Sequence, residues 1–240
     1  MGIEFISEEY GLKNNPILIC GCHGAGTSYM AKLLRFNGLF IGDDAGTADA
    51  RKFHESEMFK NINKHIYTKF GKGTSGSVDA FTDRFDNDIK DVSKFNEMAE
   101  SLIDILKLNF DGYINKNKFI TSDNIKWGWK DPRNSVTIPF WKIIFPKIKI
   151  LVIEKKWSSG KSKSSAGQWF RERSTKTLRA YYMNPPGLDK SKDDYLIVKF
   201  EKIVSDINEF NKINEWAGLK VLNQDEYDKL LSSTRFEGVS

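Results

Sequence analysis

A glycine-rich turn joins an apolar run to an amphipathic one in ILICGCHGAGTSYMAKLL, residues 17–34. Counted from Gly21, the turn reads G-x-x-x-x-G and is followed by Thr27 and Ser28, where a nucleoside triphosphatase carries a lysine and a hydroxyl residue. Backbone N–H groups of such a turn, together with the positive end of the next helix, bind phosphate without a charged side chain. Because the missing lysine is the group that contacts β- and γ-phosphates, the turn predicts a site for a single phosphate group. The alternative is a turn that only packs the helix on the strand.

A second group of polar residues follows a short strand-like segment at GWKDPR, residues 128–133. Pro132 restricts the backbone of this turn. We expect Lys130 to supply the cation that the glycine turn lacks, and Asp131 and Arg133 to pair and brace the turn. The alternative is an ordinary surface ion pair, which contributes little to stability.

Two further stretches offer groups for an anion. His23 lies inside the glycine turn, and an ordinary histidine pKa of about 6.5 makes either protonation state accessible near neutral pH. It either contacts the transferred group or is a polar loop residue bonded to the backbone. The segment KKWSSGKSKSS at 155–165 is rich in lysine and serine, which bind anions through charge and hydrogen bonds. A disordered basic linker is the alternative for this segment.

Apolar and amphipathic runs alternate along the chain, and this alternation determines where the polar groups lie. The runs predict strands at 16–21, 147–155 and 193–201, and helices at 27–38, 51–70, 92–110, 138–145, 168–183 and 207–219. Such an order predicts an α/β fold with three α/β/α layers and a mostly parallel central sheet. Ligands of these folds bind beyond the carboxyl ends of the strands. The polar motifs all follow strands, so they are expected to share one edge of the sheet.

The composition narrows the class of protein. Residues 1–240 are expected to form a single domain, since no long linker or repeat divides the chain. The formal net charge of +5 suits an anionic ligand but is too small and scattered to predict nucleic-acid binding. The apolar runs are shorter than the roughly 20 residues of a membrane span and the N-terminus does not resemble a signal peptide, so a cytoplasmic protein without membrane association is expected. Cys20 and Cys22 are badly spaced for a disulfide and predict no metal site. The sequence gives no prediction of oligomeric state.

Three segments resemble one enzyme family. ILICGCHGAGTSYMAKLL resembles the 5′-phosphosulfate loop of sulfotransferases that use 3′-phosphoadenosine 5′-phosphosulfate (PAPS), with the usual form G-x-x-R-S-G-T-S/T. GWKDPRNSVTIPFWKIIFPKIKILVIEK is similar to the family's K-D-P-R segment and the strand leading to its 3′-phosphate site. DDYLIVKFEKIVSDINEFNKINEWAGL is similar to its late strand and helix, and the matches span most of residues 16–219. The chain departs from the pattern at Gly24 and Ala25, where the family has Arg or Lys and Ser.

The resemblance implies a P-loop NTPase-like fold and transfer of a sulfuryl group from PAPS to a hydroxyl of a carbohydrate or small molecule. The product would be 3′,5′-adenosine bisphosphate (PAP), and no metal is expected. The residues implied for the phosphosulfate are His23, Gly24, Ala25, Gly26, Thr27 and Ser28, and those implied for the 3′-phosphate are Lys155, Ser162 and Ser164. The stretch KFHESEMFKNINKHI is similar to a region of bacterial members with an acidic residue, which implies Glu55 as the base. The remaining implied roles are catalytic for His23 and Lys130, and acceptor-side or loop-bracing for His54, Asp131 and Arg133.

Two other functions stay open at the level of sequence. A P-loop nucleoside or nucleotide kinase would need the missing lysine and an aspartate for Mg²⁺ at a strand end. A nucleotide-binding relative that has lost turnover is suggested by Gly24 and Ala25. The acceptor itself is not encoded in any motif of the chain.

Overall fold

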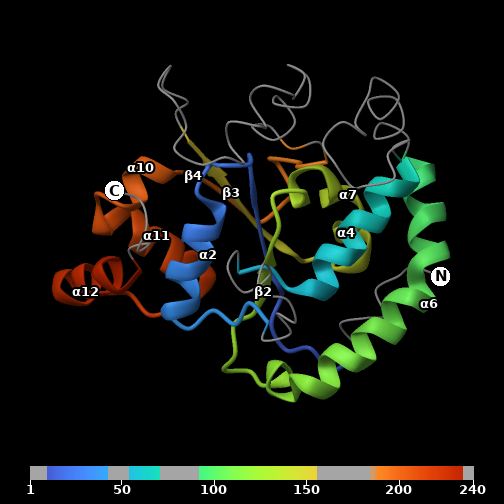
Figure 1. The fold of residues 1–240 in the computed structure, drawn as a ribbon, viewed down its shortest axis with the longest axis horizontal. Coiled ribbons are helices and arrows are strands. Elements are labelled where there is room, and N and C mark those ends of the chain that lie inside the picture. The colour runs from blue at the N-terminus through green and yellow to red at the C-terminus, as the bar shows by residue number, and fades with distance from the viewer. Residues whose placement is uncertain (1–9, 43–53, 71–91, 156–184, 186, 235–240) are drawn as a thin grey trace.

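A computed structural model of the chain describes residues 10–42, 54–70, 92–155, 185 and 187–234 (Figure 1). The elements in chain order are β1 (Ile17–Gly21), α2 (Thr27–Phe36), α4 (Glu57–Phe70), α6 (Val92–Lys116), the 3₁₀ turn η2 (Lys118–Thr121), β2 (Gly128–Lys130), α7 (Asn134–Ile144), β3 (Lys149–Glu154), β4 (Tyr195–Lys199), α10 (Phe200–Ile203), α11 (Ile207–Ala217) and α12 (Gln224–Thr234). The predicted helix at 168–183 lies outside the described residues.

The four strands form one parallel sheet in the order β2-β1-β3-β4. Leu18 of β1 pairs with Trp129 of β2 on one side and with Ile150 of β3 on the other. Every residue of β1 is buried. A strand covered on both faces reads as an unbroken apolar run instead of an alternating one, as ILICG does. The prediction of a parallel α/β fold is confirmed.

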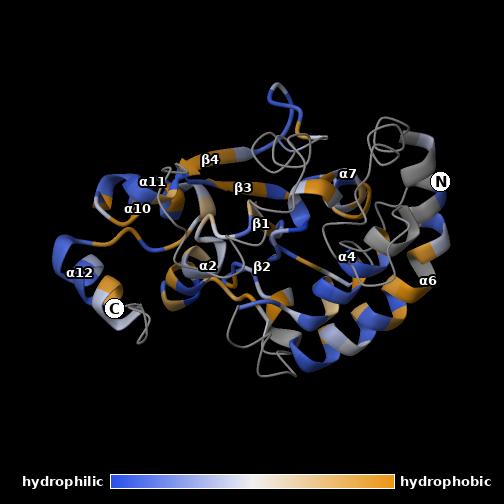
Figure 2. Cartoon of the chain, turned by 45° about the horizontal axis from the view of Figure 1, so that its top comes forward, coloured by the Kyte–Doolittle hydropathy of each residue, from blue (hydrophilic) through white to orange (hydrophobic). Residues whose placement is uncertain are grey.

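Helices cover both faces of this sheet, because successive residues of a strand point to opposite sides. Leu18 belongs to a hydrophobic cluster with residues of α4, α6 and α7. Ile17 and Ile19 belong to a second cluster with residues of α2, α11 and α12. Figure 2 shows β3 and β4 in hydrophobic colours between the helices, with α12 mostly hydrophilic.

Aromatic packing fixes α4 against β2. The ring of Phe59 on α4 stacks on Trp129 of β2 with 4.1 Å between centroids, and meets Trp141 of α7 edge-on at 5.5 Å. Such pairs add about 0.5–1.5 kcal/mol each beyond the burial of their area. Glu55 lies two residues before α4, so this packing brings it to the end of β2.

Helix ends and faces agree with the sequence in some places and differ in others. Helix α11 ends at Gly218, whose φ of 69° is left-handed, as the sequence predicts for a closing glycine. Ile105 of α6 is 48% exposed, although it lies three residues after the buried Leu102 and directly before the buried Leu106. Helix α12 was not predicted. Within the described ranges, no helix combines the length and apolarity that a membrane span needs.

Candidate functional site

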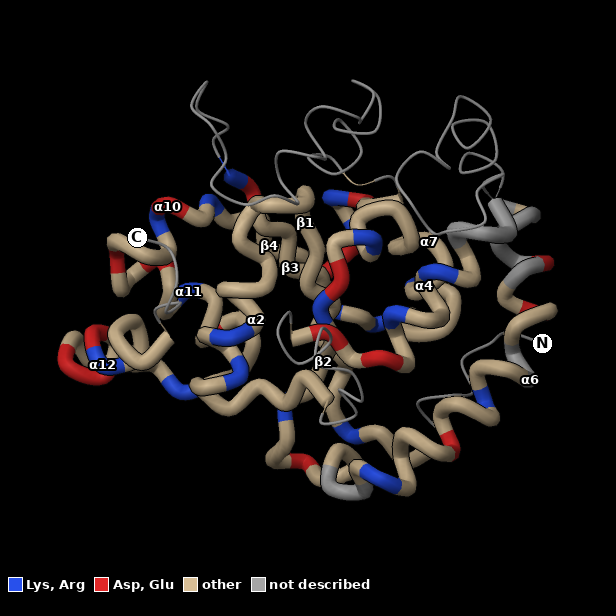
Figure 3. Tube along the Cα trace, in the orientation of Figure 1, with Lys and Arg blue, Asp and Glu red and all other residues tan. Residues whose placement is uncertain are grey.

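The carboxyl ends of β1 and β2 are neighbours, because these strands pair in parallel register. The chain leaves β1 at Gly21 and enters α2 at Thr27, and it leaves β2 at Lys130 and enters α7 at Asn134. The two predicted motifs therefore meet at one edge of the sheet. Figure 3 shows basic and acidic positions alternating along the chain where β2 runs toward α7.

Close packing around two glycines sets the shape of the first loop. Gly21 has φ +145°, and a Cβ there would lie 2.4 Å from the carbonyl oxygen of Ile153. Gly26 has φ +93°, and a Cβ there would lie 2.3 Å from the ring of Phe200. Neither site can take a side chain without movement of β3 or of Phe200, so the loop is held tightly against the sheet.

The loop leaves several backbone N–H groups available to a ligand. Gly26 is the N-cap of α2 and no side chain caps this helix. The amide of Ala25 donates to the carbonyl oxygen of Cys22 at 2.9 Å. The backbone amides of Gly24, Gly26, Thr27 and Ser28 donate no hydrogen bond to any of the described residues. An anion at this helix start would meet these amides and the positive end of the α2 dipole. Ala25 differs from the prediction, since its amide is already used within the loop.

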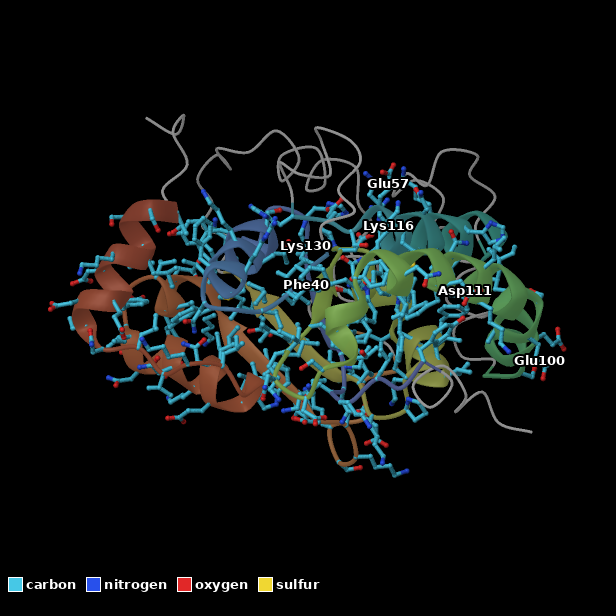
Figure 4. All side chains as sticks on the ribbon, turned by 90° about the horizontal axis from the view of Figure 1, so that it is seen from below. Phe40, Glu57, Glu100, Asp111, Lys116 and Lys130 are labelled. Carbon is cyan, nitrogen blue, oxygen red and sulfur yellow. The ribbon has the colours of Figure 1, made fainter. Side chains whose placement is uncertain are left out.

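Lys130 brings a cation to this loop from the neighbouring strand. Its Nζ lies 2.8 Å from Oε1 of Glu55 and 3.1 Å from Oγ of Ser28. The side chain is 1% exposed, and Figure 4 shows it at the centre of the molecule between α2 and α4. Burial lowers the pKa of Lys130, while the charge and hydrogen bond of Glu55 act in the opposite direction. The ammonium group thus occupies the space beside the helix start without belonging to the loop.

Asp131 and Arg133 form the pair that the sequence suggests. Arg133 Nε lies 2.8 Å from Oδ1 and 3.0 Å from Oδ2 of Asp131, and the Arg133 amide donates to Oδ1 at 2.9 Å. Burial by itself raises the pKa of Asp131, but Arg133 and the hydrogen bonds hold it below the usual value. Arg133 Nη2 also lies 3.9 Å from Oε2 of Glu55. Glu55 is therefore placed between two cations.

The two histidines near the site are held in the neutral form. Removal from water lowers the pKa of His23 to about 4; Asp131 acts against this shift, and Arg133 and Lys130 add to it. Removal from water also lowers the pKa of His54 to about 4, with smaller effects of nearby cations, Arg35 first. His54 adopts φ +53°, and its Nδ1 is buried without a hydrogen-bond partner among the described residues. A neutral imidazole in the loop can accept or donate a hydrogen bond without adding charge.

Only part of the implied 3′-phosphate site is described. Lys155 directly follows β3, and its Nζ lies 5.0 Å from the ring centroid of Phe200. The same ring contacts Gly26 of the loop. Lys155 is therefore close to the glycine loop, on the side away from β2. Ser162 and Ser164 lie outside the described residues.

Three polar residues at this edge were missed by the sequence reasoning. Ser135 Oγ accepts a hydrogen bond from the Gly21 amide at 3.1 Å, and Asn134 Nδ2 donates to the Ile19 carbonyl at 3.1 Å. Asn63 of α4 is fully buried and bonds both Asp131 and Asn134. The signal for Asn63 in the sequence was its place next to Ile62, an apolar position of the helix expected at 51–70.

The described residues do not contain a group of three or more His, Cys, Asp or Glu side chains that could hold a metal ion. Burial raises the pKa of Cys20 to about 12, against a smaller effect of a hydrogen bond with Ser135. That thiol stays protonated at neutral pH and is a poor nucleophile and metal ligand.

Comparisons of the chain with models of known protein families, with curated proteins and with solved structures found no match. A functional assignment must therefore rest on the motifs and on the arrangement of side chains where β1 and β2 end. Fold alone does not specify chemistry, so the site residues carry the argument.

Proposed function

We propose that this chain is a sulfotransferase with a P-loop-like phosphate site, which transfers a sulfuryl group from PAPS to a hydroxyl of a carbohydrate or small molecule. One observation carries the proposal. The loop has no lysine of its own, yet Lys130 of the adjacent strand places its ammonium 3.1 Å from Ser28 and 2.8 Å from Glu55. A phosphate cradle, a cation and a carboxylate thus lie within contact of one another.

The residues present fit the phosphosulfate end of PAPS. The amides of Gly24, Gly26, Thr27 and Ser28 are suited to the oxygens of one phosphate group. Lys130 approaches from the side of Ser28, where it can neutralise charge that develops on a leaving oxygen. Lys155, beyond Phe200, is near enough to the loop to serve the second phosphate of the same nucleotide.

In this proposal PAPS supplies the activated sulfuryl group, and the chain supplies position, charge and a base. The bond between the acceptor oxygen and sulfur forms as the bond between sulfur and the bridging oxygen breaks. Glu55 accepts the proton of the acceptor hydroxyl, and Lys130 donates a hydrogen bond to the oxygen that leaves with PAP. Arg133 holds the other oxygen of Glu55 at 3.9 Å. Neutral His23 adds a polar contact inside the loop without competing for the acceptor proton.

The ion pair between Lys130 and Glu55 gives the site a simple order of events. While Lys130 is bound to Glu55, the ammonium group occupies one of the two carboxylate oxygens. An anionic donor on the loop competes for the ammonium, because its oxygens lie beside Ser28. Binding of the donor therefore releases Glu55 to act on the acceptor.

A kinase fits the site less well. The aspartate at the strand end, Asp131, has both carboxylate oxygens occupied by Arg133 and Asn63. Titrating the protein with PAP, and separately with ATP and Mg²⁺, while following the melting temperature distinguishes the two functions. We expect stabilisation by PAP, in line with ligand binding to the folded state. Stabilisation by ATP and Mg²⁺ alone would reject the sulfotransferase.

Turnover is tested separately from binding. PAPS labelled with ³⁵S is incubated with the protein and with sets of carbohydrate and small-molecule alcohols, and label on the acceptor is counted. We expect transfer to at least one hydroxyl class. PAP binding without transfer to any acceptor would favour a nucleotide-binding relative that lacks turnover.

A further inference from the structure

Asn63 on α4 makes an unusually complete set of hydrogen bonds for a fully buried side chain. Its Nδ2 donates to Oδ2 of Asp131 at 3.0 Å and to Oδ1 of Asn134 at 2.7 Å. Its Oδ1 accepts from Oγ1 of Thr137 at 2.8 Å and from Nε1 of Trp141 at 2.9 Å. Both protons and both lone pairs of the amide are used. A side chain held in this way has one orientation.

We propose that Asn63 is a positioning residue for the site where β1 and β2 end: it sets the Asp131 carboxylate and, through Arg133, the position of Glu55 beside Lys130. The proposal deepens the proposed function and rests on it for the catalytic consequence. The geometric part, which places Glu55 and Lys130 in contact, does not depend on what the site binds.

The path from Asn63 to Glu55 runs through a direct contact at every step. Asn63 fixes Oδ2 of Asp131, and both oxygens of Asp131 bond Arg133 Nε. Arg133 then reaches Oε2 of Glu55 at 3.9 Å, and Lys130 takes the other oxygen at 2.8 Å. Turning the Asp131 carboxylate would shift Arg133, and with it one of the two cations that hold Glu55.

The second amide proton of Asn63 connects the same side chain to the strand that leads into the glycine loop. Asn134 accepts this hydrogen bond, and its own Nδ2 donates to the carbonyl oxygen of Ile19 on β1. Two residues later, β1 ends at Gly21. Asn63 therefore connects the helix that follows Glu55 with the strand that leads into the phosphate loop. Because the connection is buried, its hydrogen bonds are not replaced by water when they are lost.

If Asn63 has this role, Asn63→Ala should change kcat much more than the affinity for PAP. Since Asn134 keeps its own hydrogen bond to Ile19 and the loop amides are not altered, we expect the affinity for PAP to change by less than about threefold, well below the tenfold that 1.4 kcal/mol produces. Since Glu55 loses its alignment with the acceptor, we expect kcat to fall by about a hundredfold, as misplacement by an ångström can produce. A merely structural role would lower the amount of folded protein and leave kcat per folded molecule unchanged.

Chemical labelling tests the geometry without relying on any activity. The full chain is acetylated with an N-hydroxysuccinimide ester, and modification of Lys130 is followed by mass spectrometry. Wild type, Asn63→Ala and Asn214→Ala are compared at one pH, with folding checked by circular dichroism. Asn214 is the matched control, because it is also a fully buried asparagine on a helix but lies on α11, and among the described residues its Nδ2 bonds only Asn211.

We expect Lys130 to be labelled about tenfold faster in Asn63→Ala than in the other two proteins, because loss of hydrogen bonds worth about 1.4 kcal/mol corresponds to that factor. Equal labelling in all three folded proteins would overturn the proposal. If Asn63→Ala does not fold, Asn63→Asp replaces it, since Asp has nearly the same volume and keeps the acceptor for Thr137 and Trp141. The carboxylate removes the donor half and sets an anionic oxygen against Asp131, so faster labelling supports the role and unchanged labelling overturns it.

The two proposals fail in different ways. If wild type neither binds PAP nor transfers sulfate, the proposed function is wrong, and the labelling rates still decide whether Asn63 positions Lys130 and Glu55. If wild type is active and Asn63→Ala keeps its kcat, the function stands and the positioning role is wrong.

Discussion

Two short ion pairs in different parts of the molecule differ in what surrounds them. Lys130 and Glu55 lie 2.8 Å apart where β1 and β2 end, and Lys212 and Glu209 lie 2.5 Å apart on α11. The side chain of Lys130 is 1% exposed, whereas that of Lys212 is 62% exposed. Distance alone would rank the pair on α11 as the stronger one. Burial reverses this ranking, because water screens an exposed pair and leaves a buried one unscreened.

The directions of the pKa shifts also differ between the buried and the exposed lysine. Burial lowers the pKa of Lys130 even though Glu55 opposes the shift. The hydrogen bond that Lys212 donates to Glu209 is the largest cause of the raised pKa of Lys212. The first lysine loses solvation on burial, while the second gains a partner at the surface. Buried charges kept near a loop of open amides are typical of functional sites.

The largest expected effect is that of Lys130→Ala. Among the described residues, the change leaves Glu55 with only the distant Arg133 as a cation, and it opens a cavity. We therefore expect a loss of about 3–5 kcal/mol in the free energy of unfolding, as for a broken buried pair. Urea denaturation measures this loss. Sulfate transfer should be impaired as well, while PAP binding is largely retained through the loop amides.

Lys212→Ala is the matched control for this change, measured in the same way. We expect its urea curve to overlay that of wild type. Equal destabilisation by the two lysine variants would mean that burial does not separate the two pairs.

Glu55→Gln tests the carboxylate with little change in shape. The amide cannot accept the acceptor proton, so we expect transfer to fall by about 10²–10⁴-fold, the usual contribution of a general base. The affinity for PAP should be largely retained, because Glu55 faces the acceptor and not the loop amides. Isothermal titration with PAP and the label-transfer assay give the two quantities, with Glu209→Gln as the control on α11. Unchanged turnover in Glu55→Gln would remove this residue from the catalytic set.

The sequence could predict those elements that depend on local pattern. The apolar run and glycines around Gly21 identified β1 and the loop, and the order of strands and helices predicted the parallel sheet. The contact of Lys130 with Ser28 was suggested only as a missing cation, since it depends on the register between β1 and β2. Asn63 was missed entirely. Its role depends on how α4 packs on α7, and an asparagine beside an apolar position does not reveal three partners on that helix and a fourth, Asp131, in the turn before it.

Gly26 in the loop and Gly218 at the end of α11 allow the same two regions to be compared for backbone strain. In Gly26→Ala the new Cβ meets the Phe200 ring at 2.3 Å, in a backbone with φ +93°. We expect a loss of about 1–3 kcal/mol, as for a strained site with overpacking, and weaker PAP binding because the loop must move. Gly218→Ala is the control on α11: φ is +69°, but the nearest atom is the flexible end of Lys126 at 3.1 Å.

The Gly218 control is expected to lose only about 1 kcal/mol, the usual cost of a left-handed alanine. PAP binding by this variant should equal that of wild type. Urea denaturation and PAP titration of both variants check these values. If both glycine changes weaken PAP binding alike, the contact between the loop and Phe200 does not shape the phosphate site.

The pH dependence of stability between pH 7 and pH 5 should come from the two histidines near the glycine loop. The folded-state pKa of His23 and of His54 is about 4, below the ordinary value of about 6.5. The unfolded chain therefore binds more protons between these values, and stability falls as the pH is lowered from 6.5 toward 4. Urea denaturation at pH 7 and pH 5 should show a loss that is smaller in His23→Asn. An equal loss in that variant would show that His23 does not contribute.

The pair on α11 supplies the control for this pH range. The pKa of Glu209 is lowered, mainly by its hydrogen bond with Lys212, so its contribution is present above the ordinary glutamate value of about 4.5 and is lost only below it. Glu209→Gln should therefore leave the change between pH 7 and pH 5 as it is in wild type. A smaller loss of stability between pH 7 and pH 5 in this variant would show that Glu209 contributes to the pH dependence.

The smallest expected effect is the coupling between Lys212 and Glu209 themselves. A double-mutant cycle of Lys212→Ala and Glu209→Ala isolates their interaction from the contacts each makes alone. Although the pair is separated by only 2.5 Å, both groups are hydrated and pay side-chain entropy to meet, so we expect the cycle to close within error. The same cycle with Lys130→Ala and Glu55→Ala should not close, because each single change leaves a charge in a site with little water. A resolved coupling on α11 as large as the one at the end of β2 would show that the distance between charges, and not their surroundings, decides the energies of both regions.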